Sequence, residues 1–243
     1  MGTLDQTMIP PADRLALFLD FDGTLVPFAD TPESVIVPHD LPASLAAIST
    51  RLDGALAIVT GRPAKQVDGF LNSAVDAVAG EHGATVRWPD GRVERLALPD
   101  MQSELATAQK AVEGLDGVWI ERKSAGFAVH YRLAPSQRET VKASMINLAV
   151  ERSDLHLLDG NHVFELRAAA ANKGAAVRSF MVSPPFQNRV PVFVGDDTTD
   201  EDAFAAAQDL GGLGIKVGEG ETCAKLRLAD CAAVHAFLRD LLA

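Results

Sequence analysis

The sequence predicts an α/β protein in which a mainly parallel sheet is interrupted by a smaller α+β domain. Near the start of the chain, short apolar runs alternate with stretches of helical spacing, which is typical of a parallel sheet with helical crossovers. In the middle, a helix followed by two strands occurs twice, and after residue 172 the opening pattern returns. We therefore expect a core formed by residues 1–85 and 169–243, with residues 86–168 inserted between its halves.

The first core segment has the pattern of strand, helix, strand, helix, strand. Its first strand is an uninterrupted apolar run, as expected for a strand covered on both faces. The second helix begins near Pro63, because proline is favoured in the first turn of a helix. The expected strands are residues 15–19, 55–59 and 75–79, and the expected helices are residues 41–52 and 63–71.

The inserted segment is expected to form a small antiparallel sheet with two helices on one face. It opens with a hairpin over residues 86–98, around the Asp90-Gly91 pair that favours a tight turn. Apolar residues at helical spacing around 101–115 and 141–148 predict the helices. The expected strands are residues 118–123, 127–132, 155–158 and 162–167, the last two joined by a turn at Asp159-Gly160.

The second core segment repeats the α/β pattern. A helix is expected at residues 173–180, and an apolar strand at 190–194 ends in Gly195-Asp-Asp-Thr-Thr-Asp200. A further helix, a strand at 214–217 and a closing helix at 234–242 complete the core.

Composition limits the kinds of partner. The 243 residues carry a net charge of -11, which repels nucleic acid and anionic membranes. The apolar run at 15–19 is far too short to cross a bilayer and lacks signal-peptide architecture. Cys223 and Cys231 form no C-x-x-C pattern, which argues against a zinc site or a disulfide framework. We expect a cytoplasmic monomer whose partner is a small molecule.

Carboxylates gather where two expected strands end. Asp20 and Asp22 follow the first strand, while Asp196 and Asp197 follow the strand at 190–194, with Asp200 shortly beyond. Ligands of open parallel sheets bind beyond the carboxyl ends of the strands, so these acids are expected to converge. Closely spaced carboxylates repel each other unless a cation joins them. A ligand set made only of oxygen suits Mg²⁺, which we expect as the cofactor.

Groups suited to a phosphate occupy the same edge. The Thr60 hydroxyl, the Lys173 ammonium and the backbone N–H groups of Gly23, Thr24 and Gly61 could hold a phosphate dianion. With those groups in place, Asp20 would act as the nucleophile and form an aspartyl phosphate. Asp22 would protonate the leaving oxygen and later activate water.

The strands of the insert supply a polar face. Because side chains alternate along a strand, Glu121 and Lys123 lie on one side with Trp119. If the helices cover the apolar face, this polar face is open to a sugar. From the residues alone, a solvated sheet face is the favoured interpretation of Glu121, Lys123 and Glu165.

The quoted motifs resemble, in order, those of the haloacid-dehalogenase (HAD) phosphatase superfamily: Asp20-Phe-Asp-Gly-Thr-Leu, Thr60-Gly-Arg, Lys173-Gly and Gly195-Asp-Asp-Thr-Thr-Asp. Longer blocks resemble the trehalose-6-phosphate phosphatase family, with its type C2 cap. They include Gly80-Glu-His-Gly83, Glu121-Arg-Lys123, Val129-His-Tyr-Arg132 and the extension of the last motif to Phe204. The resemblance covers nearly the whole chain from about Leu15.

This resemblance implies a parallel Rossmann-like HAD core with an α+β cap, and a Mg²⁺-dependent hydrolysis of trehalose 6-phosphate. It implies that Mg²⁺ is held by the carboxylates of Asp20 and Asp196 and the backbone carbonyl of Asp22. Asp200 would support the metal's water shell, and Lys173 would neutralise the nucleophile and the phosphate. The expected substrate contacts are Gly23, Thr24, Gly61, Arg62, Glu121, Lys123, His130, Arg132 and Glu165, with Thr60 joining Asp20, Asp22 and Lys173 in catalysis.

Some interpretations stay open at this point. Arg62 is either a surface residue at a helix start or a contact to substrate or to the other domain, and His82 and His130 are either structural or directed at the cleft. Two other functions compete: a HAD sugar phosphatase of the sucrose-phosphate or mannosyl-phosphoglycerate type, and a non-catalytic binding protein that regulates a sugar-nucleotide synthase. The intact set of catalytic residues argues against the latter.

Overall fold

The computed structural model describes residues 6–29, 31, 34–160 and 162–243, which form two compact units. The larger unit, here called the core, comprises residues 1–95 and 172–243, and the smaller, here called the insert, comprises residues 96–171. The α/β fold class predicted from the sequence is confirmed: a mainly parallel sheet in one unit and a separate antiparallel sheet in the other. Within the described residues, no helix is long and apolar enough to cross a membrane.

The core is built on an eight-stranded sheet with the order β12-β11-β10-β1-β2-β3-β4-β5. Its strands from β12 to β3 run parallel, while β4 and β5 pair antiparallel at one edge. The bounds of the strands are β1 Leu15–Leu19, β2 Leu56–Val59, β3 Ala77–Gly80, β4 Thr85–Arg87, β5 Val93–Arg95, β10 Val190–Gly195, β11 Leu213–Val217 and β12 Leu226–Leu228.

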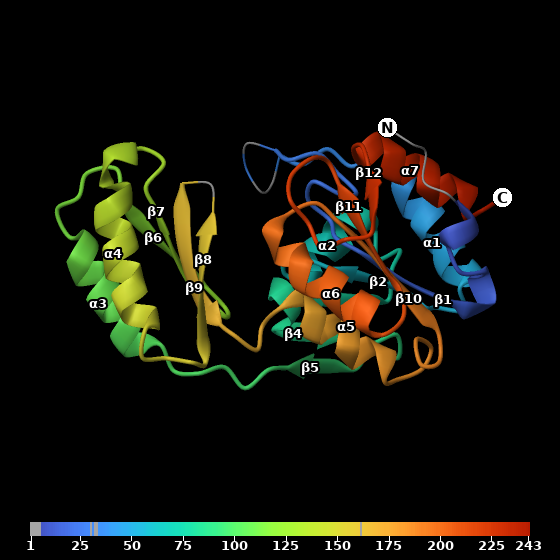
Figure 1. Ribbon diagram of the computed structural model, residues 1–243, viewed down its shortest axis with the longest axis horizontal. Helices are drawn as coiled ribbons and strands as arrows, with labels where there is room; N and C mark the ends of the chain where they lie inside the picture. The colour runs from blue at the N-terminus through green and yellow to red at the C-terminus, as the bar shows by residue number, and fades with distance from the viewer. Residues whose placement is uncertain (1–5, 30, 32–33, 161) are drawn as a thin grey trace. The chain divides into compact units, whose positions relative to one another are not determined.

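Helices cover both faces of this sheet, so β1 is fully buried, as its apolar run predicts. Helices α5 and α6 pack side by side on one face, and α1 packs against α7 on the other (Figure 1). The helices of the core are α1 Leu41–Arg51, α2 Ala64–Leu71, α5 Lys173–Met181, α6 Glu201–Asp209 and α7 Cys231–Asp240. The short strand β12 is the one core strand without a counterpart among the expectations.

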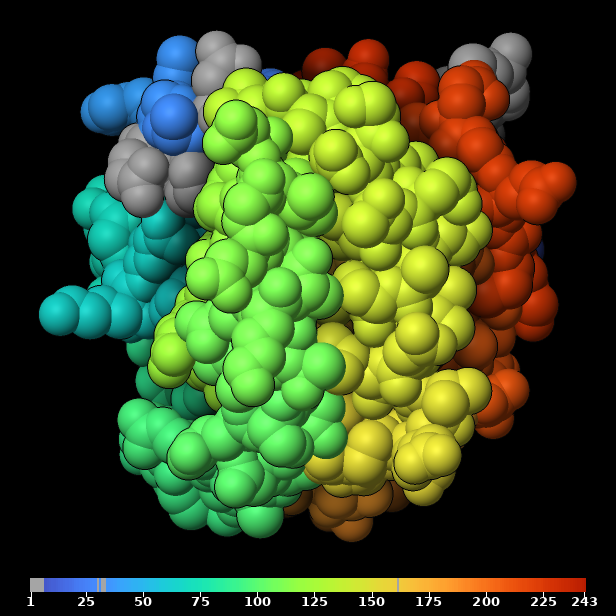
Figure 2. Space-filling view, turned by 90° about the vertical axis from the view of Figure 1, so that its left-hand side faces the viewer, coloured from blue at the N-terminus to red at the C-terminus, as the bar shows by residue number. Residues whose placement is uncertain are grey.

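The insert is a four-stranded antiparallel sheet with the order β6-β7-β9-β8 and two helices on one face. Figure 2 looks onto the outer side of these helices, which lie next to each other. Phe127, Val129, Phe164 and Leu166 pack beneath them in a separate apolar core. The elements are α3 Gln102–Val112, β6 Trp119–Lys123, β7 Gly126–His130, α4 Arg138–Ala149, β8 Leu155–Gly160 and β9 Val163–Ala168.

The division into units differs from the expected boundaries at residues 85/86 and 168/169. The hairpin of β4 and β5 is present, but β4 pairs with β3 in the register Ala79↔Val86, so the hairpin extends the core sheet. The chain enters the insert after Arg95 and returns at Asn172. The sheet that a hairpin joins is decided by its backbone pairing. The residue pattern of the hairpin does not reveal this pairing.

Candidate active site

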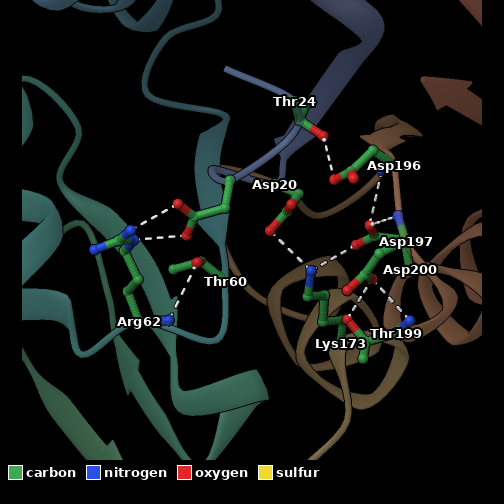
Figure 3. Close-up of polar contacts among 10 residues, drawn as sticks. Asp20, Thr24, Thr60, Arg62, Lys173, Asp196, Asp197, Thr199 and Asp200 are labelled. Atoms are coloured by element: carbon green, nitrogen blue, oxygen red, sulfur yellow. Dashed lines mark hydrogen bonds and ion pairs between the residues drawn. The ribbon is translucent and has the colours of Figure 1, made fainter. Parts of the chain in front are cut away.

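The acidic residues meet because their two strands are neighbours. Strand β10 pairs with β1 in the register Leu19↔Val194, and Asp20 N donates to Val194 O at 2.9 Å. Asp20 and Asp196 therefore leave the sheet side by side, and the Asp200 side chain joins them (Figure 3). One carboxylate oxygen from each of Asp20, Asp196 and Asp200 lies within 4.8 Å of the others. The predicted convergence of remote carboxylates is thus present.

Lys173 sits at the first position of α5 and points into this cluster. The preceding residue, Asn172, caps the helix by accepting a hydrogen bond from Ala175 N at 2.7 Å. Lys173 Nζ lies 2.8 Å from Asp20 Oδ1 and 2.7 Å from Asp200 Oδ1, and all three side chains are buried. The ammonium group therefore bridges the first and last motifs of the sequence.

The Asp200 side chain stabilises the loop that follows β10. Its Oδ2 accepts hydrogen bonds from Asp196 N at 2.9 Å and Asp197 N at 3.0 Å, while its other oxygen bonds Lys173. The Asp197 carboxylate in turn accepts hydrogen bonds from the N–H and hydroxyl of Thr199. This network leaves the Asp196 carboxylate, which accepts a 3.3 Å bond from Thr24 Oγ1, as the acid of this loop turned toward Asp20.

Lys216 is a site residue that sequence reasoning missed. It lies at the end of β11 opposite Gly195, is 5% exposed, and its Nζ donates to the backbone carbonyl of Asp196. A charged residue inside the apolar run at 213–217 is the signal that could have identified it. Its ammonium group adds a second positive charge beside the acids.

The cluster carries more negative than positive charge. Burial raises the pKa of Asp20 well above its ordinary value of 3.8, an effect that Lys173 opposes and Asp200 reinforces. Burial and the charges of Asp200 and Asp197 raise the pKa of Asp196 to about 7. Burial alone would lower the pKa of Lys173, but the neighbouring carboxylates outweigh it and raise that pKa.

Charge balance and chemistry together fit a divalent cation. With all groups ionised, Asp20, Asp196, Asp197 and Asp200 bring four negative charges, and Lys173 and Lys216 bring two positive ones. A bound cation of charge +2 would neutralise the remainder and favour the ionised carboxylates. The oxygen donors of Asp20 and Asp196 are of the type that hard cations bind.

Asp22 is paired with Arg62 and is not among the acids of the possible metal cluster. Arg62 donates from Nε to Asp22 Oδ2 at 2.6 Å and from Nη2 to Asp22 Oδ1 at 2.7 Å, a bidentate pair. The guanidinium also lies over the rings of Phe21 and Phe70, at 5.5 and 5.1 Å from their centroids. To the two interpretations of Arg62 from the sequence, the structure adds a third, in which Arg62 is the ion-pair partner of Asp22.

The groups expected to bind the phosphate differ in the hydrogen bonds that they already make within the protein. The Gly23 N–H donates to Val26 O at 2.7 Å and is thus engaged within its own turn. The Thr24 hydroxyl bonds Asp196, and the Thr60 hydroxyl accepts a 3.2 Å bond from Arg62 N. Within the described residues, the Gly61 N–H donates to no acceptor.

The insert presents its predicted polar face opposite the helices. Ala128 lies between Glu121 and Glu165 in the pairing register, so the two acids share this face. Lys123 Nζ lies 2.6 Å from Glu165 Oε2, and His130 Nε2 lies 2.9 Å from Glu121 Oε2. The His130 ring stacks on Trp119 with centroids 4.8 Å apart, while Arg132 is exposed beyond the end of β7.

The family described as trehalose-phosphatase matches residues 18–232, which include both core segments, the insert and every acid of the cluster. The chain belongs to the trehalose-phosphatase family. The fold of this family member is shared by a solved sugar phosphatase whose description places that protein in HAD subclass IIB. That structure has a TM-score of 0.64 at 16% identity and covers 93% of this chain and 99% of its own.

Relatives of known name agree with this assignment. The chain is 45% identical over 209 residues to a probable trehalose-phosphate phosphatase of Sinorhizobium fredii, covering 85% of this chain and 78% of that one. It is 34% identical to the trehalose-6-phosphate phosphatase of Escherichia coli, covering 93% and 85%. The C-terminal domain of the Candida albicans trehalose-6-phosphate phosphatase shares the fold, with a TM-score of 0.80 at 22% identity over 95% and 92%.

Proposed function

We propose that this member of the trehalose-phosphatase family hydrolyses trehalose 6-phosphate to trehalose and inorganic phosphate. The observation that carries the proposal is the centre formed by buried Asp20 and Lys173 with half-buried Asp196, in a chain that matches the family over residues 18–232. The relatives from S. fredii and E. coli are named for the same activity, which supports the substrate.

The cofactor we propose is Mg²⁺. The carboxylates of Asp20 and Asp196, with the backbone carbonyl of Asp22, would hold it, while Asp200 orders the loop that carries Asp196. When bound, Mg²⁺ offsets negative charge on the cluster and on the transferring phosphate.

The reaction we propose has two steps on Asp20. An Asp20 carboxylate oxygen attacks the phosphorus, the bond to the sugar oxygen breaks, and Asp22 delivers a proton to that oxygen. Water, deprotonated by Asp22, then attacks the aspartyl phosphate and releases inorganic phosphate. Lys173 stabilises the charge of the phosphate, and the Thr60 hydroxyl and the Gly61 N–H bind its oxygens.

The Asp22–Arg62 pair has a consequence for this scheme. Both carboxylate oxygens of Asp22 accept bonds from Arg62, so in this structure both are engaged by the guanidinium. Asp22 has to turn from Arg62 toward the leaving oxygen for the first step. That movement would release Arg62 from its contact with Asp22, and the role of Arg62 as a substrate contact stays a prediction.

The test of the proposed function is a phosphate-release panel with magnesium and with a chelator. The panel contains trehalose 6-phosphate, sucrose 6-phosphate, mannosyl-phosphoglycerate and glucose 6-phosphate. We expect the highest kcat/KM for trehalose 6-phosphate and no turnover with the chelator. A preference for another sugar phosphate would show that the proposed substrate is wrong and the proposed reaction type is right. Binding of trehalose 6-phosphate without release of phosphate would favour the regulatory alternative.

Sugar recognition we assign to the polar face of the insert. Replacing Lys123 and Glu165 by alanine together is expected to lower kcat/KM for trehalose 6-phosphate about 100-fold, because buried polar contacts to a substrate discriminate strongly. Turnover of p-nitrophenyl phosphate, which has no sugar, is expected to change less than about 3-fold.

The matched control is the Arg138–Asp159 pair, whose nitrogen and oxygen are 2.6 Å apart on the helix-covered side of the insert. Its double alanine variant should leave both substrates unaffected. Equal losses on both substrates in the Lys123/Glu165 variant would instead mean that these side chains serve the chemistry or the folding of the insert.

Metal binding is expected to depend on pH through Asp196. Without metal, folding raises its pKa from 3.8 to about 7, so the folded state binds the proton more tightly than the unfolded state. The stability from this group is present below about pH 4 and is lost as pH rises through about 7, at up to about 1.4 kcal/mol per pH unit. Magnesium, which replaces the proton, should therefore raise the melting temperature more at pH 8 than at pH 5.

Thermal unfolding with MgCl₂ or EDTA at the two pH values measures this difference. The Asp196→Asn variant provides the comparison, since it lacks the titrating group and should respond little to magnesium at either pH. An equal magnesium-induced shift at pH 5 and pH 8 in the unmodified protein would contradict the assignment of Asp196 as a ligand.

A further inference from the structure

The turn at residues 80–83, Gly-Glu-His-Gly, has an unusual backbone and lies next to the proposed phosphate site. Glu81, His82 and Gly83 have φ angles of 55°, 58° and 95°, all in the left-handed region. Residues with a Cβ adopt this region at an energetic cost and keep it only where surrounding contacts impose it. The sequence left His82 open between a structural role and a role in the cleft, so the contacts that impose the turn are informative.

On one side, the turn holds the loop that carries Thr60 and Gly61. His82 N donates to Thr60 O at 2.9 Å, and Glu81 N donates to Arg62 O at 3.1 Å. These two bonds fix the carbonyl groups on either side of Gly61. The His82 ring lies against Gly61 itself: a Cβ added there would be 2.7 Å from His82 Nε2 and 2.9 Å from Cε1. A Cβ at position 61 would therefore displace the imidazole, so the ring limits the Gly61 backbone from that side.

On its other side, the turn packs against the start of α5. A Cβ added to Gly83 would lie 3.1 Å from Asn172 O and 3.1 Å from the Ala176 side chain. Asn172 is the capping residue that immediately precedes Lys173. A bond of 2.8 Å from Thr85 Oγ1 to Glu81 Oε2 holds the end of the turn in place. The 80–83 turn is thus wedged between the backbone that bears Gly61 and the helix end that bears Lys173.

We propose that His82 is a positioning residue for phosphate binding. Its ring fixes the backbone of Gly61, so that the Gly61 N–H and the Lys173 ammonium are held at a constant separation for the phosphate. The Gly61 N–H supports this role because it has no acceptor within the described part of the chain. The inference rests on the proposed phosphatase function, and in it the imidazole touches neither the sugar nor the reacting atoms.

The inference makes a prediction that a sugar contact would not. Because His82 acts on the phosphate site, His82→Asn should lower kcat about 10- to 100-fold, and equally for trehalose 6-phosphate and p-nitrophenyl phosphate. Misplacement of a catalytic group by about 1 Å is enough for a loss of that size. The affinity for inorganic phosphate, measured by calorimetry in the presence of magnesium, should fall by a similar factor. Asparagine tolerates the left-handed backbone, so the melting temperature should be retained. His39→Asn, at an exposed histidine of the core, is the control.

A double-mutant cycle with Gly61 tests the contact itself. Gly61→Ala alone should be strongly impaired, since its Cβ would meet the ring. Adding His82→Ala removes the ring and makes room for that Cβ, so the double variant should be at least as active as Gly61→Ala. Losses that simply multiply would show that the two residues act independently.

Three results would overturn the inference: a loss confined to trehalose 6-phosphate, which would make His82 a sugar contact; an unchanged phosphate affinity; or a lowered melting temperature with unchanged kinetics. Failure of the proposed function has a different signature. In that case the unmodified protein does not release phosphate from trehalose 6-phosphate, and the comparison of phosphate affinities still decides whether His82 positions the phosphate site.

Discussion

Asp20→Asn is expected to abolish turnover, with kcat falling on the order of 10³-fold or more, as removal of a nucleophile does in other enzymes. The amide cannot attack phosphorus under these conditions, and it removes one oxygen of the proposed metal site. The side chain keeps its shape, so we expect the fold to be retained. Phosphate release from trehalose 6-phosphate with magnesium measures the loss.

The control is Asp209→Asn, which makes the same chemical change at an exposed position at the end of α6. It should leave kcat unchanged. Trapping the phosphorylated protein adds a second measurement: unmodified protein quenched in acid during turnover should gain one phosphate in mass, and Asp20→Asn should gain none. Residual activity of the variant above a few per cent would refute Asp20 as the nucleophile.

Lys173→Met is expected to impair both catalysis and stability. The ammonium bonds Asp20 and Asp200, and all three side chains are buried, so its loss leaves two carboxylates without their shared partner. Breaking a buried ion pair from one side costs about 3–5 kcal/mol of folding stability. Loss of a preorganised positive charge at the phosphate should lower kcat by about 10²–10³-fold.

Magnesium separates the two effects. It should recover part of the stability of Lys173→Met, because a divalent ion can neutralise Asp20, whereas kcat should stay low at saturating magnesium. Lys225→Met, at an exposed lysine of the core, controls for the change in net charge. If Lys173→Met unfolds as the unmodified protein does and retains full activity, the lysine is not part of the centre.

Much of the fold could be predicted because long apolar runs and helical spacing are local signals. The expected strand at 15–19 has the bounds of β1, and the expected strand at 190–194 is β10 without its last glycine. By contrast, β12 is three residues long, too short for a periodic pattern. The sequence assigns the hairpin after β3 to the insert, because its residues, exposed in β5, do not indicate which sheet it extends.

The site could be predicted where a motif lies at the end of a strand. It could be predicted less well where a contact depends on side-chain conformation. The expected meeting of Asp20 with Asp196 follows from the pairing of β1 with β10, and Lys173 reaches Asp20 from the start of α5. The bidentate bond between Arg62 and Asp22 depends on rotamers of residues 40 positions apart. Lys216 was missed because its acceptor is a backbone carbonyl, which no sequence pattern displays. The assigned roles of the site residues remain predictions for the variants above.

The strand order has a consequence for biosynthesis on the ribosome. Strand β1 pairs with β10, so one edge of the strand that carries the nucleophile stays open until residue 195 has left the exit tunnel. The strands β6 to β9 of the insert pair with one another within residues 96–171, so the insert can fold while that edge of β1 is still unpaired. Nascent chains of intermediate length therefore expose an apolar strand edge, the kind of surface to which chaperones bind.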